Sequence, residues 1–509
     1  MLLHSFPGGL RLAGHKAVST AGGLQPVTMP ARLRLALQQH AGPPALPCVA
    51  PGDRVARGQR IASADGELSA DLHAPCAGRV EAIEPGDPAA PPGRQGAHIV
   101  LVPQGGAEAP RWPALDPDTA SPEALRERIR AAGVVGLGGA GFPTAEKLSV
   151  GRELLVLNGA ECEPWIACDD ALLREHADEV VLGGRVMARV VGAARVLLAI
   201  EDSMPEALAA ARAACQAQGD GRIDVVAVPT IYPQGGERQL IRTLTGREVP
   251  RAGLPRDIGV IVQNVATARA AWRAVAHGEP LLERIVTVTG PGVARPGNFI
   301  VPLGTPVAHL VAQAGGYTDA ARRLLLGGPM MGLALPHDQF TLGKPDNCVL
   351  VLGDADLRPV GDEMPCIRCG DCASACPARL LPQQLLWQVR ADRLDEARDQ
   401  GLFDCIECGC CDLACPSHIP LTAHFRHGKS ALRLRAAEAG RAEAARERYE
   451  SRLQRLQREA DEREQRLAER RAGAAQPEAV AAALARARAR RTGDGDAGPA
   501  TEDDGGTTP

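Results

Sequence analysis

Aromatic residues are scarce in this chain: only 3% of its 509 residues are Phe, Trp or Tyr. Net charge is also small, because 57 Lys and Arg oppose 61 Asp and Glu, which leaves −4. Binding to nucleic acid through the overall electrostatic field of a protein needs a basic excess. We therefore expect no nucleic-acid partner.

Long uninterrupted apolar runs are missing as well. The most apolar stretch, residues 180–200, contains Arg185, Arg189 and Arg195, whereas a membrane-spanning helix needs about 20 residues with few or no charges. The first ten residues, MLLHSFPGGL, lack the basic region and apolar core of a secretion signal. The sequence thus predicts a chain that does not itself cross a membrane. We expect it in the reducing cytoplasm, where cysteines bind metal rather than form disulfides.

The cysteines carry the strongest signal, because eight of the 15 form an internal repeat. The pattern C-x2-C-x2-C-x3-C-P begins at Cys366 and recurs at Cys405. Three cysteines at this spacing wrap around one iron–sulfur cubane, and the fourth, before Pro, binds the other cubane in two-cluster ferredoxins. We predict two [4Fe-4S] clusters, one held by Cys366, Cys369, Cys372 and Cys415 and the other by Cys405, Cys408, Cys411 and Cys376.

Zinc is the competing metal, since structural zinc sites also use C-x2-C pairs. Those sites usually place a longer loop between two pairs, whereas here four cysteines crowd each run and Pro follows both. The pattern therefore favours iron and sulfide. It leaves Cys410 outside the ligand set, as a neighbour of the second cluster.

Composition and turn residues predict a multidomain protein of mixed α/β and α+β class. Residues 1–118 contain two halves, 51–61 and 73–83, that resemble a biotinyl/lipoyl-type barrel sandwich, but the connecting hairpin has no lysine to carry a prosthetic group. Residues 119–280 alternate between expected strands (154–157, 195–200, 224–228) and helices (171–182, 204–216), which is typical of a wound α/β domain. The remaining predicted regions are a compact β/α module at 281–352, a cysteine-rich domain at 358–425, a charged helical tail at 426–472 and a disordered end at 473–509.

A glycine-rich segment, GVVGLGGAGFP, runs from Gly133 to Pro143. Glycines let backbone N–H groups approach a phosphate, but such turns are common, and this segment taken alone is better explained as an ordinary tight connection. The stretch Asn158–Pro164 follows an expected strand and contains Glu161 and Glu163. Two carboxylates then lie at the edge where open α/β sheets bind ligands. A solvated acidic turn is the alternative for this stretch.

Together the two segments resemble the FMN site of the NADH-oxidising subunit of respiratory complex I, which combines a GRGGAGFPT loop with an NADEGEP stretch. The resemblance implies a Rossmann-like FMN/NADH domain, followed at 281–352 by a soluble-ligand-binding β-grasp domain. Leu137 and Ala160 depart from the motifs, where that family has Arg and Asp. The cofactor-binding residues that it implies are Gly136, Gly138, Gly139, Ala140, Gly141, Phe142 and Lys147 in the loop, and Asn158, Glu161 and Glu163 in the stretch.

The order of all these parts closely resembles the C subunits of the Rnf (Rsx) ion-translocating electron-transport complexes. The resemblance implies a peripheral subunit on the cytoplasmic face of the bacterial inner membrane, held by integral-membrane and ferredoxin-like partner subunits. It implies electron transfer between NADH and ferredoxin or related carriers, through FMN and two [4Fe-4S] clusters, coupled to ion translocation. No residue is expected to act as a nucleophile. The alternatives are a soluble diaphorase subunit of a dehydrogenase or hydrogenase and an electron-relay scaffold with a vestigial flavin pocket.

Overall fold

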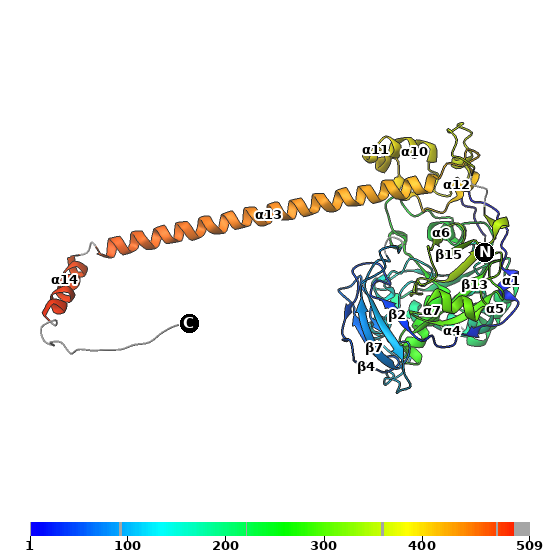
Figure 1. The fold of residues 1–509 in the computed structure, drawn as a ribbon, viewed down its shortest axis with the longest axis horizontal. Coiled ribbons are helices and arrows are strands. Elements are labelled where there is room, and N and C mark those ends of the chain that lie inside the picture. The colour runs from blue at the N-terminus through cyan, green and yellow to red at the C-terminus, as the bar shows by residue number, and fades with distance from the viewer. Residues whose placement is uncertain (1, 91–93, 220, 358–360, 475–476, 493–509) are drawn as a thin grey trace, which may run out of the picture. The chain divides into compact units, whose positions relative to one another are not determined.

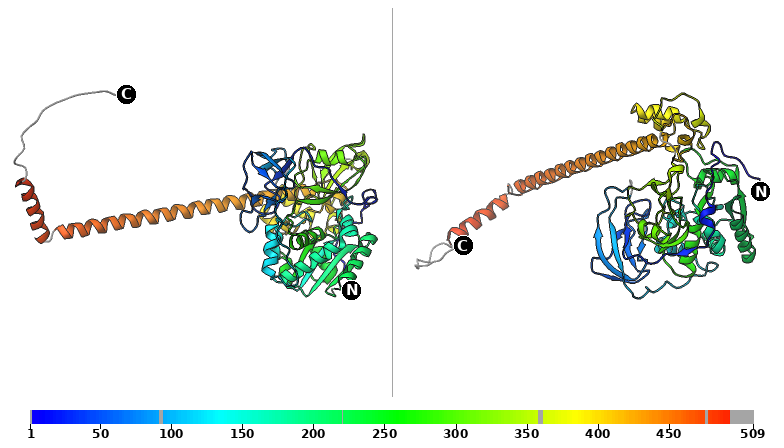
Figure 2. Two further views of the ribbon diagram at one scale, coloured as in Figure 1. Left: turned by 90° about the horizontal axis from the view of Figure 1, so that it is seen from below. Right: turned by 45° about the vertical axis from the view of Figure 1, so that its right-hand side comes forward.

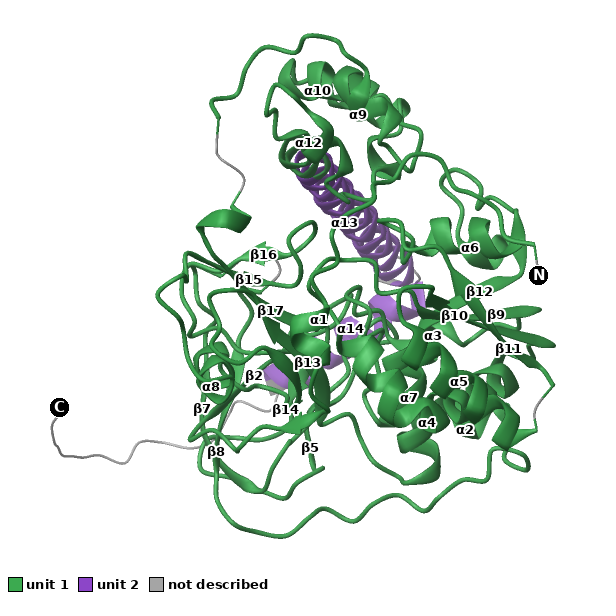
Figure 3. Cartoon of the chain, turned by 90° about the vertical axis from the view of Figure 1, so that its right-hand side faces the viewer, with its two compact units in different colours: residues 1–429 green, residues 430–509 purple. Residues whose placement is uncertain are grey.

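The computed structural model describes residues 2–90, 94–219, 221–357, 361–474 and 477–492. The chain divides into two compact units, residues 1–429 and 430–509 (Figure 3). Figure 1 labels the helices and strands along the chain. All of the sheets and both cysteine runs belong to the first unit. Among the described helices, none combines the length and the apolarity that crossing a bilayer requires.

Two small antiparallel sheets form the barrel sandwich, with strand orders β2-β8-β7-β4 and β3-β5-β6. Side chains alternate across each strand, so Leu33 and Leu35 of β2 are fully buried while Arg34 between them is partly exposed. The strands are β2 (Leu33–Ala36), β3 (Leu46–Pro47), β4 (Arg54–Val55), β5 (Arg60–Ser63), β6 (Leu72–His73), β7 (Gly78–Glu84) and β8 (His98–Pro103).

The segment before β2 lies outside both sheets of the sandwich. Leu10 forms an antiparallel bridge with Tyr232, and the short helix α1 (Ala17–Thr20) follows. The strand β1 (Gln25–Pro26) then pairs with an edge strand of another sheet. Free backbone groups at a sheet edge are satisfied by such pairing. The N-terminal segment thus connects modules that lie far apart in the sequence.

A parallel four-stranded sheet with the order β11-β10-β9-β12 is the centre of the α/β domain. The strands expected at 154–157, 195–200 and 224–228 are confirmed. Strand order reverses between β9 and β12, and open α/β sheets bind ligands at such a switch point. The strands are β9 (Leu154–Gly159), β10 (Arg195–Glu201), β11 (Ile223–Val228) and β12 (Val260–Asn264), and the helices are α2 (Pro122–Ala131), α3 (Thr144–Lys147), α4 (Cys168–Val191), α5 (Pro205–Gln218), α6 (Glu237–Thr245) and α7 (Val265–Ala276).

This sheet is buried on both faces. Leu155 and Leu157 of β9 pack into a core shared with α4, α5 and α7, whereas Val156 packs into a separate core with α6. Figure 3 shows α6 on the opposite side of the strands from those three helices. Continuous apolar runs are typical of parallel strands covered in this way, which is why the sequence predicted them well.

Helix α4 is longer than predicted. The expected helix ended at residue 182, before Gly183 and Gly184, but α4 continues to Val191. A Cβ added at Gly183 would lie 1.9 Å from the carbonyl oxygen of Ala268 in α7. The glycine therefore allows close approach of two helices rather than ending one of them.

We expect Gly183→Ala to lower the free energy of unfolding of the first unit by about 2 kcal/mol, because α4 and α7 must separate to admit the methyl group. Thermal unfolding measures this loss. Gly440→Ala is the matched control, since Gly440 also lies inside a helix, α13 (Leu421–Ala474), but faces open space. Unchanged melting of Gly183→Ala would contradict the close contact.

A mixed six-stranded sheet follows, with the order β1-β14-β13-β17-β15-β16. β13 pairs antiparallel with β14 and parallel with β17, and β17 pairs antiparallel with β15. The helix α8 (Val307–Gln313) buries Val307, Leu310 and Val311 against this sheet. The strands are β13 (Glu283–Thr289), β14 (Gly297–Pro302), β15 (Arg323–Leu326), β16 (Leu333–Ala334) and β17 (Cys348–Leu352).

The C-terminal part is helical. Its helices are α9 (Asp371–Ser374), α10 (Pro382–Arg390), α11 (Leu394–Asp399), α12 (Cys410–Ala414), α13 and α14 (Pro477–Thr492). Figure 2 shows α13 as one continuous helix, as expected for the charged tail. The prediction of disorder from residue 473 is wrong for α14, whose Ala and Arg residues are strong helix formers. Residues 493–509 lie outside the described residues.

Candidate functional site

The glycine-rich segment forms a closed loop. Gly136 N–H donates to the carbonyl oxygen of Phe142 at 2.8 Å, and Gly141 N–H donates back to that of Gly136 at 3.1 Å. Between these bonds, residues 138–140 are exposed, and we call them the glycine arc. Within the described part of the chain, the three N–H groups of the glycine arc donate to no other group. They are available to an anionic ligand such as a phosphate.

The loop lies at the switch point between β9 and β12. Leu137 N–H donates to Oγ1 of Thr267, in the first turn of α7, at 2.9 Å. Gly138 faces Asn264, the last residue of β12, so closely that an added Cβ would lie 3.3 Å from the Asn264 side chain. The side chain of Asn264 also accepts a hydrogen bond from Ala266 N–H and so caps α7. The glycine arc thus lies at the N-terminus of a helix, where an anion is stabilised.

The two residues that depart from the complex I motifs serve packing. Leu137 is 3% exposed and belongs to the core of the barrel sandwich, and the buried Arg284 donates to its carbonyl oxygen at 3.2 Å. Ala160 is 7% exposed and packs in the α6 core. Neither replacement removes the free N–H groups of the glycine arc. The loop as it stands fits a phosphate-bearing cofactor such as FMN.

Asn158 and Lys147, two more of the predicted cofactor-binding residues, connect loops near the switch point. The Asn158 amide donates to the carbonyl oxygen of Gly235 at 2.9 Å, and its oxygen accepts from Ala160 N–H at 3.0 Å. Lys147 forms an ion pair of 2.8 Å with Glu237, at the start of α6. Lys147 remains partly exposed, so its charge contributes to the field beside the loop.

Glu161 caps helix α4. Its carboxylate accepts hydrogen bonds from the N–H groups of Asp169 and Asp170 at 3.0 and 3.3 Å and from the Cys168 thiol at 3.2 Å. Lys16, from the N-terminal segment, lies 3.7 Å away as an ion-pair partner. Because Glu161 is only 7% exposed, the alternative of a solvated acidic turn is wrong for this residue.

Asp169 connects this cap to the switch point. Asn264 donates to its carboxylate at 2.6 Å. Burial, and next the nearby Glu161 carboxylate, raise the pKa of Asp169 to about 7. A carboxyl group with this pKa exchanges a proton near neutral pH.

Glu163 points toward the six-stranded sheet. Its carboxylate accepts from the N–H groups of Met330 and Met331 at 2.6 and 3.0 Å, and the Tyr232 hydroxyl lies against it. Burial raises the pKa of Glu163. The two predicted carboxylates therefore have separate contacts in this structure, and their role toward a nucleotide stays a prediction.

Glu201, at the end of β10, is fully buried, and neither of its carboxylate oxygens accepts a well-formed hydrogen bond from the described residues. Burial raises its pKa from 4.5 to about 7. The folded state therefore binds a proton more tightly than the unfolded state, and this contribution to stability is lost as the pH rises from 4.5 through about 7.

At pH 8 we expect Glu201→Gln to be more stable than the unmodified protein, by on the order of 2 kcal/mol, because no charge is then buried. At pH 4 both forms of residue 201 are neutral, so the difference should vanish. Melting temperatures at the two pH values measure the effect. Glu153→Gln, which removes an exposed charge, should show no such pH dependence. A constant difference between pH 4 and pH 8 would contradict the buried ionisation.

The cysteine repeat is visible in the backbone. Non-glycine residues with positive φ occur two residues after the first cysteine of each run, at Arg368 (60°) and Glu407 (58°). They occur again three residues after the last cysteine, at Arg379 (53°) and His418 (54°). Such conformations are uncommon for residues other than glycine. The two runs thus fold as two copies of one loop.

The predicted cysteine sets are brought together crosswise. Cys366, Cys369, Cys372 and Cys415, the first cysteine set, line one cavity of about 320 Å³. Cys376, Cys405, Cys408 and Cys411, the second cysteine set, line another of about 20 Å³, together with Cys410. Backbone N–H groups of Leu380 and Glu407 point at the sulfurs of Cys376 and Cys405, each at 3.4 Å. Four converging thiols with N–H donors fit a cubane, whose sulfurs accept such bonds.

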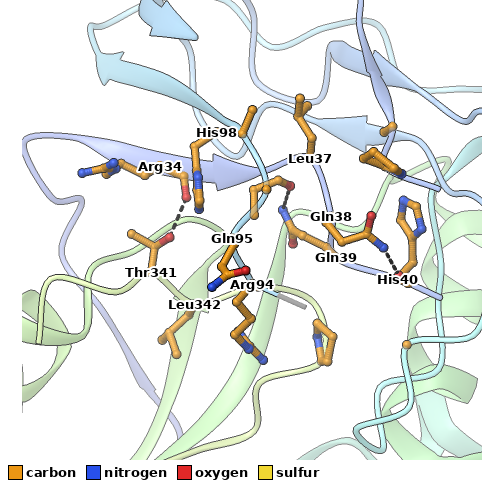
Figure 4. A pocket seen from close by; sticks show the side chains of 18 of the residues that line it. Arg34, Leu37, Gln38, Gln39, His40, Arg94, Gln95, His98, Thr341 and Leu342 are labelled. Carbon is orange, nitrogen blue, oxygen red and sulfur yellow. Dashed lines mark hydrogen bonds between the residues drawn. The ribbon is translucent and has the colours of Figure 1, made fainter. Parts of the chain in front are cut away.

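A further cavity of about 780 Å³ lies beside the glycine-rich loop (Figure 4). Arg34, His40 and His98 of the barrel sandwich line it, with residues 339–343 and Pro345 of the following module and with Ala140 and Gly141 of the loop. Burial lowers the pKa of both histidines. Figure 4 shows the Thr341 hydroxyl bonded to the Arg34 carbonyl, at 2.8 Å. Three modules thus share one cavity next to the glycine arc.

Lys344 is a buried residue that sequence reasoning missed, and it is 1% exposed. Its ammonium group donates to the carbonyl oxygens of Asp71 and Gly133 at 2.7 and 2.8 Å, joining the barrel sandwich to the start of the glycine-rich loop. Burial lowers its pKa to about 7. Lys16 was also missed, because its partner Glu161 lies 145 residues away. Nothing in the local sequence, where Gly343, Pro345 and Asp346 surround it, marks Lys344 as a buried residue.

Comparison with known protein families finds four matches along the chain. A RnfC barrel sandwich hybrid domain matches residues 4–105, a Nuo51 FMN-binding domain residues 129–273, an SLBB domain residues 285–334 and a 4Fe-4S dicluster domain residues 365–419. The chain therefore contains an FMN-binding domain and a 4Fe-4S dicluster domain, within a mixed α/β multidomain architecture.

Relatives and a solved structure resemble larger parts of the chain. A crystal structure of a NAD+-reducing [NiFe]-hydrogenase in the H2-reduced state gives a TM-score of 0.45 at 22% identity, covering 62% of this chain and 63% of that one. The C subunit of the ion-translocating oxidoreductase complex of Pseudomonas aeruginosa is 48% identical over 92% of this chain and 60% of its own length. That of Pectobacterium atrosepticum is 43% identical over 92% of this chain and 68% of its own length. This chain spans about three fifths of the length of the first relative, and it belongs to the family of ion-translocating oxidoreductase complex C subunits.

Proposed function

We propose that this chain is the peripheral redox subunit of a membrane-bound complex that couples electron transfer between NADH and ferredoxin or related carriers to ion translocation. One observation carries the proposal: a single compact unit contains both an exposed glycine arc with free N–H groups and two four-cysteine cavities. Family membership supports it. An electron carrier needs both a site for the two-electron donor and one-electron centres in the same body.

The residues of the loop would hold FMN. The glycine arc would bind its phosphate, with Lys147 contributing positive charge and the N-terminus of α7 its dipole. A bound flavin supplies the exchange between hydride transfer and single-electron transfer. Asn158 fixes the loop after β9 through its bond to the Gly235 carbonyl oxygen. Asn264, which lies against Gly138, donates to the carboxylate of Asp169. The cysteine sets would each hold one [4Fe-4S] cluster, and the dicluster domain supports this count.

The finer assignments belong to the same proposal. The α/β domain is Rossmann-like, and the strand order β14-β13-β17-β15-β16 supports a β-grasp module. The domains are divided at about residues 118, 280, 352 and 425, as the sequence predicts. The subunit is held on the cytoplasmic face of the bacterial inner membrane by integral-membrane and ferredoxin-like partner subunits, and NADH is its substrate.

Anaerobic purification with cofactor analysis tests this function. We expect bound FMN, about eight iron and eight acid-labile sulfide per chain, and bleaching of the flavin and cluster absorption on addition of NADH. Zinc without sulfide would contradict the cluster assignment. A protein that contains its clusters but no flavin, and that NADH does not reduce, would contradict the NADH-linked function.

A further inference from the structure

We propose that Arg284 and Lys344 are positioning residues of the flavin site, which hold the glycine-rich loop so that the glycine arc presents N–H groups, and no carbonyl oxygens, to a phosphate. This inference rests on the proposed function and adds to it two residues that lie outside the flavin domain. Both belong to the module that follows that domain in the sequence. A carbonyl oxygen beside an anion repels it, so an anion site made of backbone needs its carbonyl groups turned away.

Arg284 holds the peptide group that begins the glycine arc. Its guanidinium donates to the carbonyl oxygen of Leu137 at 3.2 Å, and the residue is 6% exposed. The peptide bond that follows Leu137 is trans. In a trans peptide the carbonyl oxygen and the next N–H point in opposite directions, so the N–H of Gly138 is directed away from Arg284. The bond to Leu137 therefore orients the first N–H group of the arc.

Lys344 holds the start of the glycine-rich segment. Its ammonium group donates to the carbonyl oxygens of Gly133 and Asp71, and its own carbonyl oxygen accepts a hydrogen bond from Arg284. Gly133 has φ of 65°, and an added Cβ would lie 2.3 Å from the Asp71 carbonyl oxygen and 3.1 Å from the Lys344 nitrogen. Glycine at this position thus gives the lysine access to the loop. The two cations form one connected pair.

The end of the loop is held by the same neighbouring modules. Ala41 N–H donates to the carbonyl oxygen of Gly141 at 2.9 Å. A Cβ on Gly141 would lie 3.3 Å from the Cα of His40 and 3.5 Å from the ring of Pro345, which directly follows Lys344. Groups from two other modules therefore bind carbonyl oxygens at the start, middle and end of the segment. Among the described residues, only the N–H groups of the glycine arc are left for a ligand.

Both cations are buried without a carboxylate partner. In the part of the chain that the structure describes, neither forms an ion pair, and the carboxylate of Asp71 binds Arg60 at 3.2 Å and Ala64 N–H at 2.8 Å instead. Burial lowers the pKa of Lys344 from 10.5 to about 7. The folded protein thus binds this proton less tightly than the unfolded chain, and the cost to stability grows as the pH falls from 10.5 to about 7. Stability does not explain a buried lysine here, whereas a role in holding the site does.

A loop that is held in advance binds its ligand more tightly. A glycine-rich segment loses much conformational freedom when it becomes ordered, and a segment that is already fixed avoids part of this cost on binding. Ionised donors suit this task, because their hydrogen bonds are roughly twice as strong as neutral ones. The gain concerns the phosphate, which the glycine arc binds, and not the flavin ring. The two residues should therefore affect binding of FMN but not of riboflavin, which has the same ring and no phosphate.

Binding of FMN and of riboflavin to the full chain, with its flavin removed and its clusters kept, tests this inference. Arg284→Lys keeps a buried cation, but one ammonium group does not reproduce the fork that binds two carbonyl oxygens. We expect the dissociation constant for FMN to rise about tenfold, which corresponds to about 1.4 kcal/mol. The dissociation constant for riboflavin should stay unchanged. Quenching of flavin fluorescence under anaerobic conditions measures both.

Lys344→Met should show the same selective loss, because it removes both bonds of the ammonium group and keeps a long side chain. Arg94→Met is the matched control. Arg94 forms an ion pair with Asp346 and so joins the barrel sandwich to the same module, but none of its bonds among the described residues goes to the loop. Its ratio of FMN to riboflavin affinity should equal that of the unmodified protein.

An unchanged ratio of the two dissociation constants in either variant would remove that residue from the role. An equal loss of FMN affinity in Arg94→Met would overturn the inference, because joining the modules would then matter rather than holding the loop. If Lys344→Met does not fold or loses its iron, Arg284→Lys decides, since it keeps the buried charge. If the unmodified protein binds neither flavin, or binds both equally, the proposed function fails at the glycine arc itself.

Discussion

A Gly139→Val variant is expected to lose FMN while it keeps its iron and sulfide. Gly139 has φ of 106°, and no atom of the described residues lies within 4 Å of the position that a Cβ would take. A β-branched side chain there strains the backbone and fills the space above the free N–H groups of the glycine arc. An obstruction that costs about 1.4 kcal/mol or more lowers the affinity for FMN at least tenfold. Flavin fluorescence after acid release, relative to the iron content, measures the loss.

Gly52→Val is the control for this variant. Gly52 has φ of 100° and also faces open space, but it lies in a turn of the barrel sandwich just before β4. The same strain is therefore introduced without an obstruction at the glycine arc. Equal FMN content in the two variants would show that the glycine arc does not bind the cofactor. FMN loss confined to Gly139→Val would distinguish a direct contact from general destabilisation.

Local patterns of sequence predicted the elements of this fold well. The strands of the α/β domain are continuous apolar runs, and the helix that follows Ser121 begins with the expected cap, since Ser121 accepts a bond from Ala124 N–H at 3.2 Å. The crosswise arrangement of the cysteines also follows from spacing alone. The helix expected at 171–182 was too short, because the contact that Gly183 makes with Ala268 of α7 cannot be predicted from local sequence.

The contacts of the acidic stretch could not be predicted in the same way. Glu161 is satisfied by the N-terminus of α4 and by Lys16, 145 residues earlier in the chain. Glu163 binds the turn at Met330, 167 residues later. Motif matching assigns such carboxylates to a ligand because it sees only their neighbours in sequence. Their burial depends on chain segments that only the folded structure brings together.

Cys369→Ala is expected to remove one cluster and leave the other largely assembled. Iron should fall from about eight to about four atoms per chain, with a matching loss of acid-labile sulfide. The cross-ligated arrangement predicts this half loss, because the second set shares no residue with the first. Cys369 is exposed, so its replacement removes little packing, and the loops can fold around the remaining cluster.

Cys48→Ala controls for the loss of an exposed thiol, since Cys48 lies outside both runs. It should retain all of its iron. Full iron in Cys369→Ala would exclude Cys369 as a ligand, and complete loss would show that the two clusters cannot assemble independently. Each cysteine run supplies ligands to both clusters, so the alternative is that assembly of one cluster depends on assembly of the other. The iron-to-sulfide ratio of the variant therefore tests the ligand assignment and the independence of the two loops at once.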